Sequence, residues 1–530
     1  MFNFATRSRI QAAGALIITT MLVLFVALFG GTTAQAQTAQ PVPESAKVTI
    51  TKLSQQGDLG SAATGVKTDL PKGTERINGV VFQYYLVDNT GIGGSADIGT
   101  NAGQKLAASV TAATASIPQT PTGSFIATVN GETSATLSRG LYVIKEDPTS
   151  VPAGVTAAAP FLLSVPLTDP ENLNQWLTDI YVYPKNSQIA ATKTVNNAAA
   201  LVVGNDVTWT ISADIPRVQN PAAKGATDKF LAPDYFRIDD TLQDTQLVLN
   251  PAFAEDANTS ISVKAGETSL IEGTDYKISQ VVSNPAGSKT YQILFTDDGR
   301  AALATAVNAK SDAKVTVELD TTVKSASKIE NTASIYPDSA STVPSVDKPN
   351  GNPLVTPATD VRYGSYNFQK LSSDTKVTDL SGAEFRVYAD EEDAKAGNDN
   401  YLNPTDSNEG LWTSDKDGHV SISGLRYSGY ANGKIVNKGE EGYITYYLVE
   451  TKALDGHQLL AEPVAFIVGD TTGTSTSEWK ADQDITNQAT TGAFVLPLTG
   501  GSGTTMLTIA GIAILAIVLF LARRRSAAEA

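Results

Sequence analysis

Short runs in which branched or aromatic residues alternate with polar ones recur through most of the chain. Residues 48–51, 207–211 and 315–319 are clear examples, and residues that favour turns (Gly, Pro, Asn and Asp) separate such runs. Alternation with a period of two places every second side chain on one face of a strand. Sustained helical periodicity is rare between the two ends of the chain, so we expect all-β domains of the sandwich type.

The N-terminus departs from this pattern. Arg7 and Arg9 precede an apolar stretch that ends near Phe29, and residues 34–36 read Ala-Gln-Ala. A basic segment, an apolar segment and an A-x-A site in this order are typical of a secretory signal peptide. We expect cleavage after Ala36; an uncleaved anchor is the alternative.

The C-terminus departs from it as well. An apolar run of about 17 residues, 506–522, is near the lower limit for a helix that spans a bilayer. The three arginines at 523–525 would hold that end on the cytoplasmic side, which places the preceding chain outside the cell. These two features alone fit a plain membrane anchor equally well.

A pentapeptide upstream of the apolar run changes that interpretation. It consists of Leu496, Pro497, Leu498, Thr499 and Gly500. The order of L-P-x-T-G, apolar span and basic tail resembles the cell-wall sorting signal of Gram-positive surface proteins. The resemblance implies that a sortase cleaves between Thr499 and Gly500 and passes the Thr499 carbonyl to an amine.

The length of 530 residues suggests roughly three domains between these ends. One boundary follows residues 183–186, and the proline-rich segment 337–357 forms a stiff connector at the other. The predicted order is a signal peptide (1–36), an N-terminal sandwich (37–186), a middle sandwich (187–357), a C-terminal sandwich (358–495) and a sorting signal (496–530).

Composition restricts the chemistry. The net charge of -16 argues against a nucleic-acid partner, which selects a basic surface. With no cysteine and only two histidines, the usual zinc and nucleophile-elbow chemistries have no support, and we expect no cofactor or metal. The acidic stretch 390–400 fits a solvated loop better than a cation site, because no spaced ligand pattern follows.

The first and third segments share one plan, in which a lysine, a glutamate and an asparagine follow one another in strand-like runs. Lysine and glutamate in a strand normally point to solvent, but the recurrence of all three types favours a common role. The first set is Lys52, Glu146 and Asn186, and the second is Lys370, Glu450 and Asn487.

The third segment adds a motif. Residues 447–456 resemble the E-box of major pilins of Gram-positive bacteria, with Leu454 where that family usually has proline. These pilins consist of immunoglobulin-like, collagen-adhesin-type sandwich domains with internal isopeptide bonds. The resemblance implies a Lys370–Asn487 bond promoted by Glu450.

The chemistry explains the three residue types. Burial lowers the pKa of a lysine and so favours its neutral, nucleophilic amine. Burial also keeps a carboxyl group protonated, so that it can polarise the asparagine carbonyl and move protons. Attack by the amine expels ammonia and leaves an amide. The reaction occurs once, so we do not expect an enzyme.

The middle segment resembles the other domain type of this family, in which aspartate replaces glutamate and lies between the lysine and the asparagine. The implied bond is Lys193–Asn331. The resemblance favours Asp240 as the acid, because the family places its acid two residues before the leucine of a D-x-L run and Leu242 fits that position; Asp239 is the competing choice. In the first segment a Lys52–Asn186 bond promoted by Glu146 remains an open alternative, because related pilins often lack a bond in this domain.

Residues 183–186, Tyr-Pro-Lys-Asn, close the first segment and resemble the pilin motif. The resemblance implies that Lys185 attacks the acyl-enzyme formed at Thr499 of another copy. Alternation along a strand would point Lys185 outward and Asn186 into the core. Joining of this kind does not close into a ring and gives a filament.

These features predict a major structural subunit of a covalent pilus on the cell wall, which supports adhesion. The implied partners are other copies of the chain, pilus and housekeeping sortases, minor pilins, peptidoglycan, and a host or bacterial surface receptor. The alternative is a wall-anchored adhesin or tip pilin that is not polymerised. Tip subunits usually carry a large extra binding domain and lack the pilin lysine.

Overall fold

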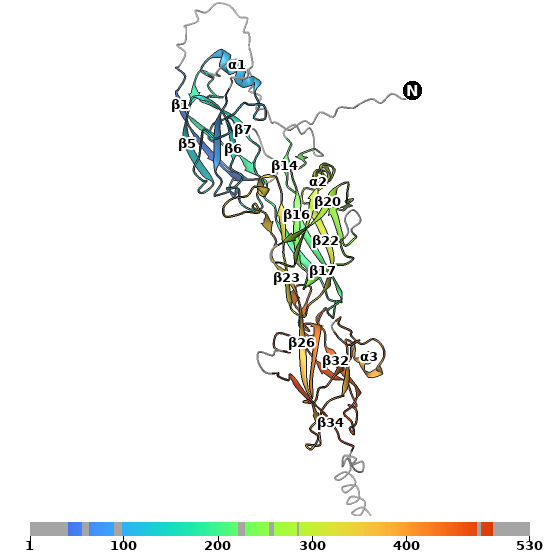
Figure 1. Cartoon of the computed structure of the whole chain (residues 1–530). Coiled ribbons are helices and arrows are strands. Elements are labelled where there is room, and N and C mark those ends of the chain that lie inside the picture. Colours follow the sequence, from blue (N-terminus) through green and yellow to red (C-terminus); the bar gives the residue numbers. More distant parts are fainter. Residues whose placement is uncertain are drawn as a thin grey trace, which may run out of the picture. The chain divides into compact units, whose positions relative to one another are not determined.

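The computed structural model describes residues 41–55, 63–88, 98–220, 228–253, 259–283, 286–405, 407–473 and 479–490. The chain divides into two compact units. One contains Met1–Gly364 and Gly424–Tyr443, and the other contains Ser365–Ser423 and Ile444–Ala530. Strands dominate both units, and the few helices in the described residues are short (Figure 1).

The first sandwich belongs to the first unit and has two main sheets. One has the order β10 (Asp179–Val182), β1 (Ser45–Thr51) and β5 (Glu132–Ser138), with β1 parallel to β10 and antiparallel to β5. The other has the order β4 (Gly123–Ser124), β3 (Phe82–Leu86), β6 (Gly140–Glu146) and β7 (Phe161–Val165). Two short pairs accompany them: β2 (Leu53–Ser54) with β11 (Lys185–Asn186), and β8 (Leu167–Thr168) with β9 (Trp176–Leu177).

The middle sandwich belongs to the first unit as well and also has two main sheets. Its first sheet has the order β12 (Ala191–Asn196), β13 (Asp206–Asp214), β22 (Lys314–Val323), β18 (Ile261–Ala265) and β19 (Thr268–Ser269), and β17 (Leu247–Leu249) also pairs with β22. Its second sheet has the order β20 (Tyr276–Ser283), β21 (Ser288–Phe295), β16 (Arg237–Gln243), β24 (Ala333–Tyr336) and β25 (Leu354–Val355). The short strands β14 (Val218–Gln219) and β15 (Phe230–Leu231) pair with each other.

The remaining strands form smaller sheets. One contains β23 (Lys328–Asn331), β26 (Thr359–Ser372), β29 (His419–Arg426) and β34 (Gln483–Asn487), the last of which pairs in parallel with β26. Another has the order β28 (Trp412–Thr413), β27 (Glu384–Tyr388), β32 (Tyr446–Lys452) and β33 (Val464–Phe466). Strands β30 (Tyr430–Ala431) and β31 (Lys434–Ile435) form a hairpin in the segment that groups with the first unit.

Among the described residues, three α-helices and one 3-10 turn connect these strands. They are α1 (Asn101–Ser109), α2 (Asp297–Ala309), α3 (Glu391–Ala396) and η1 (Ala340–Thr342). Each α-helix begins after a residue whose side chain caps its first turn, namely Thr100, Thr296 and Asp390. No helix in the described ranges is long and apolar enough to cross a membrane, and the apolar run 506–522 lies outside those ranges.

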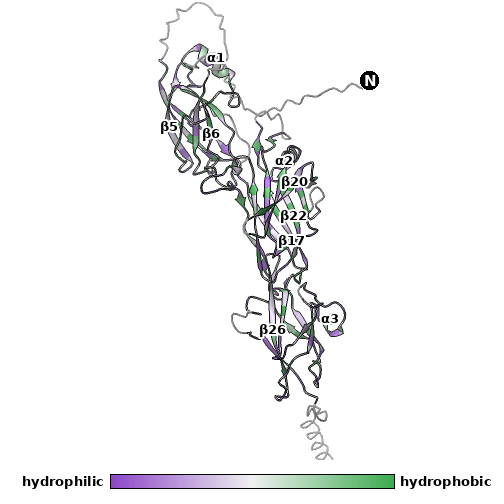
Figure 2. Ribbon diagram, viewed as in Figure 1, coloured by the Kyte–Doolittle hydropathy of each residue, from purple (hydrophilic) through white to green (hydrophobic). Residues whose placement is uncertain are grey.

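Alternation along the strands produces the cores. Strand β22 alternates buried and more exposed positions along its length, and Figure 2 shows hydrophobic and hydrophilic bands on it. Apolar side chains from both sheets of the first sandwich, such as Val48 and Ile144, form one cluster, and the middle sandwich joins Trp209 and Ile293 in the same way. In the second unit, the Phe368 and Phe385 rings pack edge to face. The prediction of all-β sandwich domains is confirmed.

Candidate cross-linking sites

The first sandwich brings together the three residues predicted for its internal bond. The Nζ of Lys52 donates hydrogen bonds to Oε1 of Glu146 and to Oδ1 of Asn186. The Nδ2 of Asn186 donates to Oε2 of Glu146 at 2.9 Å. All three side chains are buried. The amine, the acid and the amide therefore contact one another in one water-excluded site.

Burial changes the protonation of the lysine. Desolvation lowers the pKa of Lys52 from 10.5 to about 8, although the nearby carboxylate of Glu146 acts in the opposite direction. A substantial fraction of this amine is therefore neutral under mildly alkaline conditions. A neutral amine is the nucleophile that attack on the Asn186 carbonyl requires.

Lys52 itself lies between β1 and β2 rather than within a strand, unlike the strand-like run that the sequence suggested. Its N–H donates to the carbonyl of Gly131 at 2.7 Å, and its carbonyl accepts from the N–H of Ile77 at 3.0 Å. These bonds satisfy the backbone at the break between the strands and hold the side chain toward the core.

The second unit assembles the set predicted for the third segment. The Nζ of Lys370 lies 3.3 Å from Oε1 of Glu450, and the Nδ2 of Asn487 donates to Oε2 of Glu450 at 2.7 Å. The Nζ of Lys370 also donates to the carbonyl of Ile485 at 3.3 Å. Desolvation lowers the pKa of Lys370, against the effect of the Glu450 carboxylate.

These two sites share a strand register. Parallel pairing places Asn186 opposite Ser54, which is two positions after Lys52. It places Asn487 opposite Ser372, which is two positions after Lys370. Each asparagine therefore lies diagonally across from its lysine in the pairing, and in the first sandwich the Nζ of Lys52 contacts Oδ1 of Asn186.

The acids of both sites also have matching neighbours. Phe82 lies opposite Glu146 in one sandwich, and Phe385 lies opposite Glu450 in the other. Both phenylalanines are fully buried, and the Phe82 ring centroid lies 5.9 Å from the Nζ of Lys52. The lysine, acid and asparagine motifs do not include these rings. The sequence does carry a signal for them, because Phe82 follows Gly79 at the same spacing as Phe385 follows Gly382.

The middle sandwich brings Lys193 and Asp240 together. The Nζ of Lys193 donates to Oδ2 of Asp240 and, at 3.2 Å, to the carbonyl of Thr332. Burial lowers the pKa of Lys193 despite the opposing charge of Asp240. The neighbouring Asn331 is buried, and within the described part of the chain its side-chain amide has no hydrogen-bond partner. A buried amide without a partner is costly, which fits a group that is consumed by bond formation.

Asp239 and Asp240 have different surroundings. The Oδ1 of Asp239 lies 2.8 Å from Nε of Arg237, and its Oδ2 accepts from Gln292 at 3.3 Å. Burial raises the pKa of Asp239, whereas Arg237 acts in the opposite direction. The geometry therefore places Asp240, and not Asp239, against Lys193.

Lys185 and Asn186 are neighbours in β11. Lys185 is only partly buried, whereas Asn186 is almost fully buried. The strand thus presents two adjacent side chains to different environments, as alternation requires. The predicted sortase site, including Thr499, lies outside the described residues.

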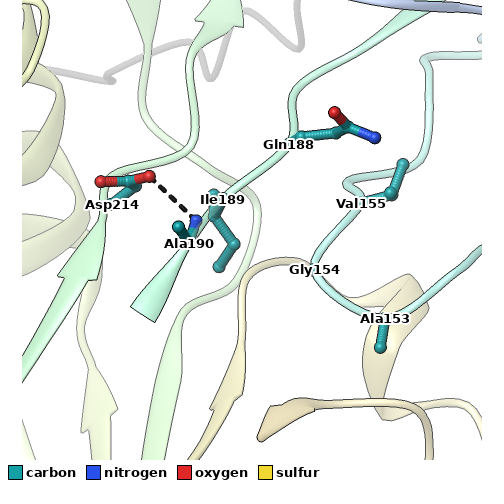
Figure 3. A pocket seen from close by; sticks show the side chains of 7 residues that line it. All are labelled: Ala153, Gly154, Val155, Gln188, Ile189, Ala190 and Asp214. Atoms are coloured by element: carbon teal, nitrogen blue, oxygen red, sulfur yellow. Dashed lines mark hydrogen bonds between the residues drawn. The ribbon is translucent and has the colours of Figure 1, made fainter. Parts of the chain in front are cut away.

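Two further features lie apart from these sites. The acidic stretch contains α3, and Asp393 within it accepts from Asn398 at 2.6 Å and from Asn400 at 3.1 Å. A pocket of about 290 Å³ is lined by residues 153–155, residues 188–190 and Asp214, whose carboxylate accepts from the N–H of Ala190 (Figure 3). None of the predicted lysines, acids or asparagines lines this pocket.

Comparisons with known proteins match three parts of the chain. Residues 43–187 match the N-terminal domain of the Gram-positive pilin subunit (D1), residues 364–483 match a prealbumin-like fold domain, and residues 488–527 match the LPXTG cell wall anchor motif. The fimbrial subunit type 1 of Actinomyces viscosus is 30% identical over an alignment of 439 residues, and the alignment covers 75% of this chain and 75% of that one.

Two solved structures show the same fold. The full-length major pilin SpaD from Corynebacterium diphtheriae has a TM-score of 0.56 and 20% identity, over 85% of this chain and 98% of that one. The major pilin SpaA from Corynebacterium diphtheriae also has a TM-score of 0.56, with 17% identity, over 84% of this chain and all of that one. The SpaA structure points to a modular pilus assembly and to stabilizing isopeptide bonds in that protein.

The fold defines a multidomain β-sandwich protein with the architecture of the solved pilins. With the wall-anchor match and a relative of this identity and coverage, the chain belongs to the family of Gram-positive, sortase-assembled fimbrial subunits. It is a pilus subunit anchored to the cell wall at the bacterial surface.

Proposed function

We propose that this chain is the repeating shaft subunit of a covalent pilus. In this proposal, a sortase cleaves between Thr499 and Gly500 and holds the Thr499 carbonyl as an acyl-enzyme. The Nζ of Lys185 from another copy attacks that carbonyl, so that an amide forms and the enzyme is released. Repetition joins copies head to tail, and a final transfer attaches the polymer to peptidoglycan.

The position of Lys185 carries this proposal. It lies beside Asn186, whose side chain is buried against Lys52 and Glu146, while Lys185 itself keeps partial exposure. Strand β11 is thereby fixed from its inner side and presents its lysine on the other side. A nucleophile held on an ordered strand reaches an acyl-enzyme with a smaller entropic cost than one on a loose loop.

We also propose internal amides in the three sandwiches, Lys52–Asn186, Lys193–Asn331 and Lys370–Asn487. Glu146, Asp240 and Glu450 would promote them by exchanging protons with the amine and the amide. Bonds across such long stretches of chain restrict the unfolded state, as disulfides do, by roughly 4 to 5 kcal/mol in the entropy model. They also withstand reducing conditions, which suits a surface protein without cysteine.

The proposed partners follow from this role. They are other copies of the chain, a pilus-building sortase, a housekeeping sortase, minor pilins and the peptidoglycan. A surface receptor on a host or on another bacterium would make adhesion the biological result. We further propose that the three sandwich domains end at residues 186, 357 and 495, as predicted from the sequence.

Peptide mass spectrometry of purified wall material tests the joint. We expect a branched peptide in which Lys185 is linked to Thr499. Wall material that contains Thr499 linked only to peptidoglycan cross-bridges would contradict polymerisation and favour a single anchored adhesin.

A further inference from the structure

The loop after β6 holds the acid of the first site. Glu146 ends this strand, and its Oε2 accepts a hydrogen bond from the N–H of Ala158 at 3.2 Å. The same oxygen accepts from Nδ2 of Asn186 at 2.9 Å. The position of Ala158 therefore bears directly on how the carboxyl group meets the amide that it would activate.

A second carboxylate holds the adjacent backbone amide. The N–H of Ala157 donates to Oδ2 of Asp338 at 2.6 Å, across 181 residues of sequence. Asp338 is 7% exposed. Consecutive N–H groups of one loop thus bind two carboxylates, Glu146 from the first sandwich and Asp338 from the segment that follows β24 of the middle sandwich.

Asp338 is itself held from the other side. It follows β24, and its Oδ1 accepts from the N–H of Ser341 at 2.8 Å. We call residues 338–352 the strap. At its far end, Nδ2 of Asn352 donates to the carbonyl of Val151 at 2.7 Å, so the strap holds the same loop at two points.

The C-terminal site differs at the corresponding point. There, Oε2 of Glu450 accepts from the N–H of Leu460 at 2.9 Å, and both residues come from the C-terminal segment itself. The first site instead depends on a residue that follows nearly all the strands of the middle sandwich in the chain.

We propose that Asp338 is a positioning residue for the Lys52–Asn186 cross-link. By fixing Ala157, it fixes Ala158 and so the orientation of the Glu146 carboxyl group. Bond formation requires such groups to be placed within a fraction of an ångström. The proposal rests on the proposed bond in the first sandwich, and it implies that this bond forms only after the middle sandwich has folded and placed the strap.

The test measures how fast each of the three internal bonds forms in the full chain after synthesis. Pulse-labelled protein is digested at successive chase times, and each cross-linked peptide is quantified by mass spectrometry. In Asp338→Ala, we expect the Lys52–Asn186 bond to form at least about tenfold more slowly. The Lys193–Asn331 and Lys370–Asn487 bonds should keep their rates and so report that the variant folds.

Two further variants separate positioning from general loosening. Asp338→Asn keeps one acceptor oxygen for Ala157, so we expect an intermediate rate for the Lys52–Asn186 bond. Asn352→Ala removes the other attachment of the strap to the loop while Asp338 remains, and we expect a rate within about twofold of the parent, because the contact that orients Glu146 is kept.

Several outcomes would overturn the proposal. One is an unchanged rate of Lys52–Asn186 formation in Asp338→Ala, and another is equal slowing in Asn352→Ala. Absence of the Lys52–Asn186 bond in the parent chain would remove both this proposal and the bond on which it rests. It would leave the joint between Lys185 and Thr499 unaffected, because wall peptides report that joint separately.

Discussion

Lys52 and Asn186 are 134 residues apart in the chain, yet the Nζ of Lys52 donates to the Oδ1 of Asn186 inside the first sandwich. The contact joins the beginning of this sandwich to its end, because Lys52 follows β1 and Asn186 lies in β11. An amide at this point would connect the two segments covalently. Lys185 directly precedes Asn186. A pulling force applied to the pilus through Lys185 would therefore pass into the Lys52–Asn186 amide at the adjacent residue.

Substitution of Lys185 tests the intermolecular joint genetically. In Lys185→Arg, the covalent high-mass ladder on a denaturing gel should disappear, because a guanidinium is protonated and does not act as the amine nucleophile. The monomer should remain folded and surface-anchored. Lys47→Arg, at an exposed position of β1, is the matched control and should keep the ladder. A ladder that persists in Lys185→Arg would refute the assignment.

Substitution of Glu450 tests acid promotion in the second unit. In Glu450→Gln, we expect the Lys370–Asn487 bond to fail, since an amide cannot exchange protons as a carboxyl group does. The intact mass of the variant should then exceed that expected for a chain with all its internal bonds by the mass of one ammonia, because the bond has not formed. Glu384→Gln, which changes a more exposed glutamate paired with Lys452, should leave the bond intact. Full cross-linking in Glu450→Gln would exclude this role.

The adjacent aspartates of β16 allow a matched comparison. Asp240→Asn should prevent the Lys193–Asn331 bond, because Asp240 is the carboxylate that contacts the lysine. Asp239→Asn should allow the bond, because Asp239 faces Arg237 and Gln292. Intact mass measures both. The reverse result, with the bond lost only in Asp239→Asn, would make Asp239 the acid.

The stability provided by the middle bond can be measured by a double-mutant comparison. Lys193→Met and Asn331→Ala each remove the bond, and we expect each to lower the free energy of unfolding of this sandwich by about 4 to 5 kcal/mol from the entropic term. The double variant should cost much less than the sum, because both changes remove the same bond. Additive losses, measured by scanning calorimetry, would show that no bond joined the two residues.

The lowered pKa of Lys52 predicts a pH dependence once its amide partner is removed. In Asn186→Ala the lysine stays free, and its pKa of about 8 in the folded chain is below the ordinary value of 10.5. Between pH values equal to these two pKa values, the folded state binds fewer protons than the unfolded state. The free energy of unfolding should therefore rise with pH across this range, by on the order of 3 kcal/mol in total. Below about pH 8 that contribution is absent.

The control for this pH dependence is the double variant Asn186→Ala with Lys52→Met, which retains the packing volume but has no titrating amine. Its first-sandwich transition in scanning calorimetry should not shift with pH in the same range. Equal slopes in the two variants would assign the effect to groups other than Lys52.

Much of the fold could be predicted from short stretches of the sequence. Alternation with a period of two, as in β22, predicted strands and therefore all-β domains, because it depends only on which residues neighbour one another. The lysine, acid and asparagine types were also recognisable in strand-like runs, and the sorting signal was readable from the order of its three parts.

The tertiary structure decided which of these residues meet. The D-x-L run favoured Asp240 but left Asp239 as a competing choice, and the packing of the second sheet of the middle sandwich is what places Asp240 against Lys193. The shared diagonal register of Lys52 with Asn186 and of Lys370 with Asn487 depends on which strands pair in parallel.

The contact of Asp338 with Ala157 gave no signal in the sequence at all, since neither residue belongs to a motif. The sequence by itself determined the period of the strands, the residue types at the cross-linking sites and the signals at both ends. The folded chain alone determined the buried neighbours of each group, because pairing between distant strands and burial are properties of the packed structure and not of any local run of residues.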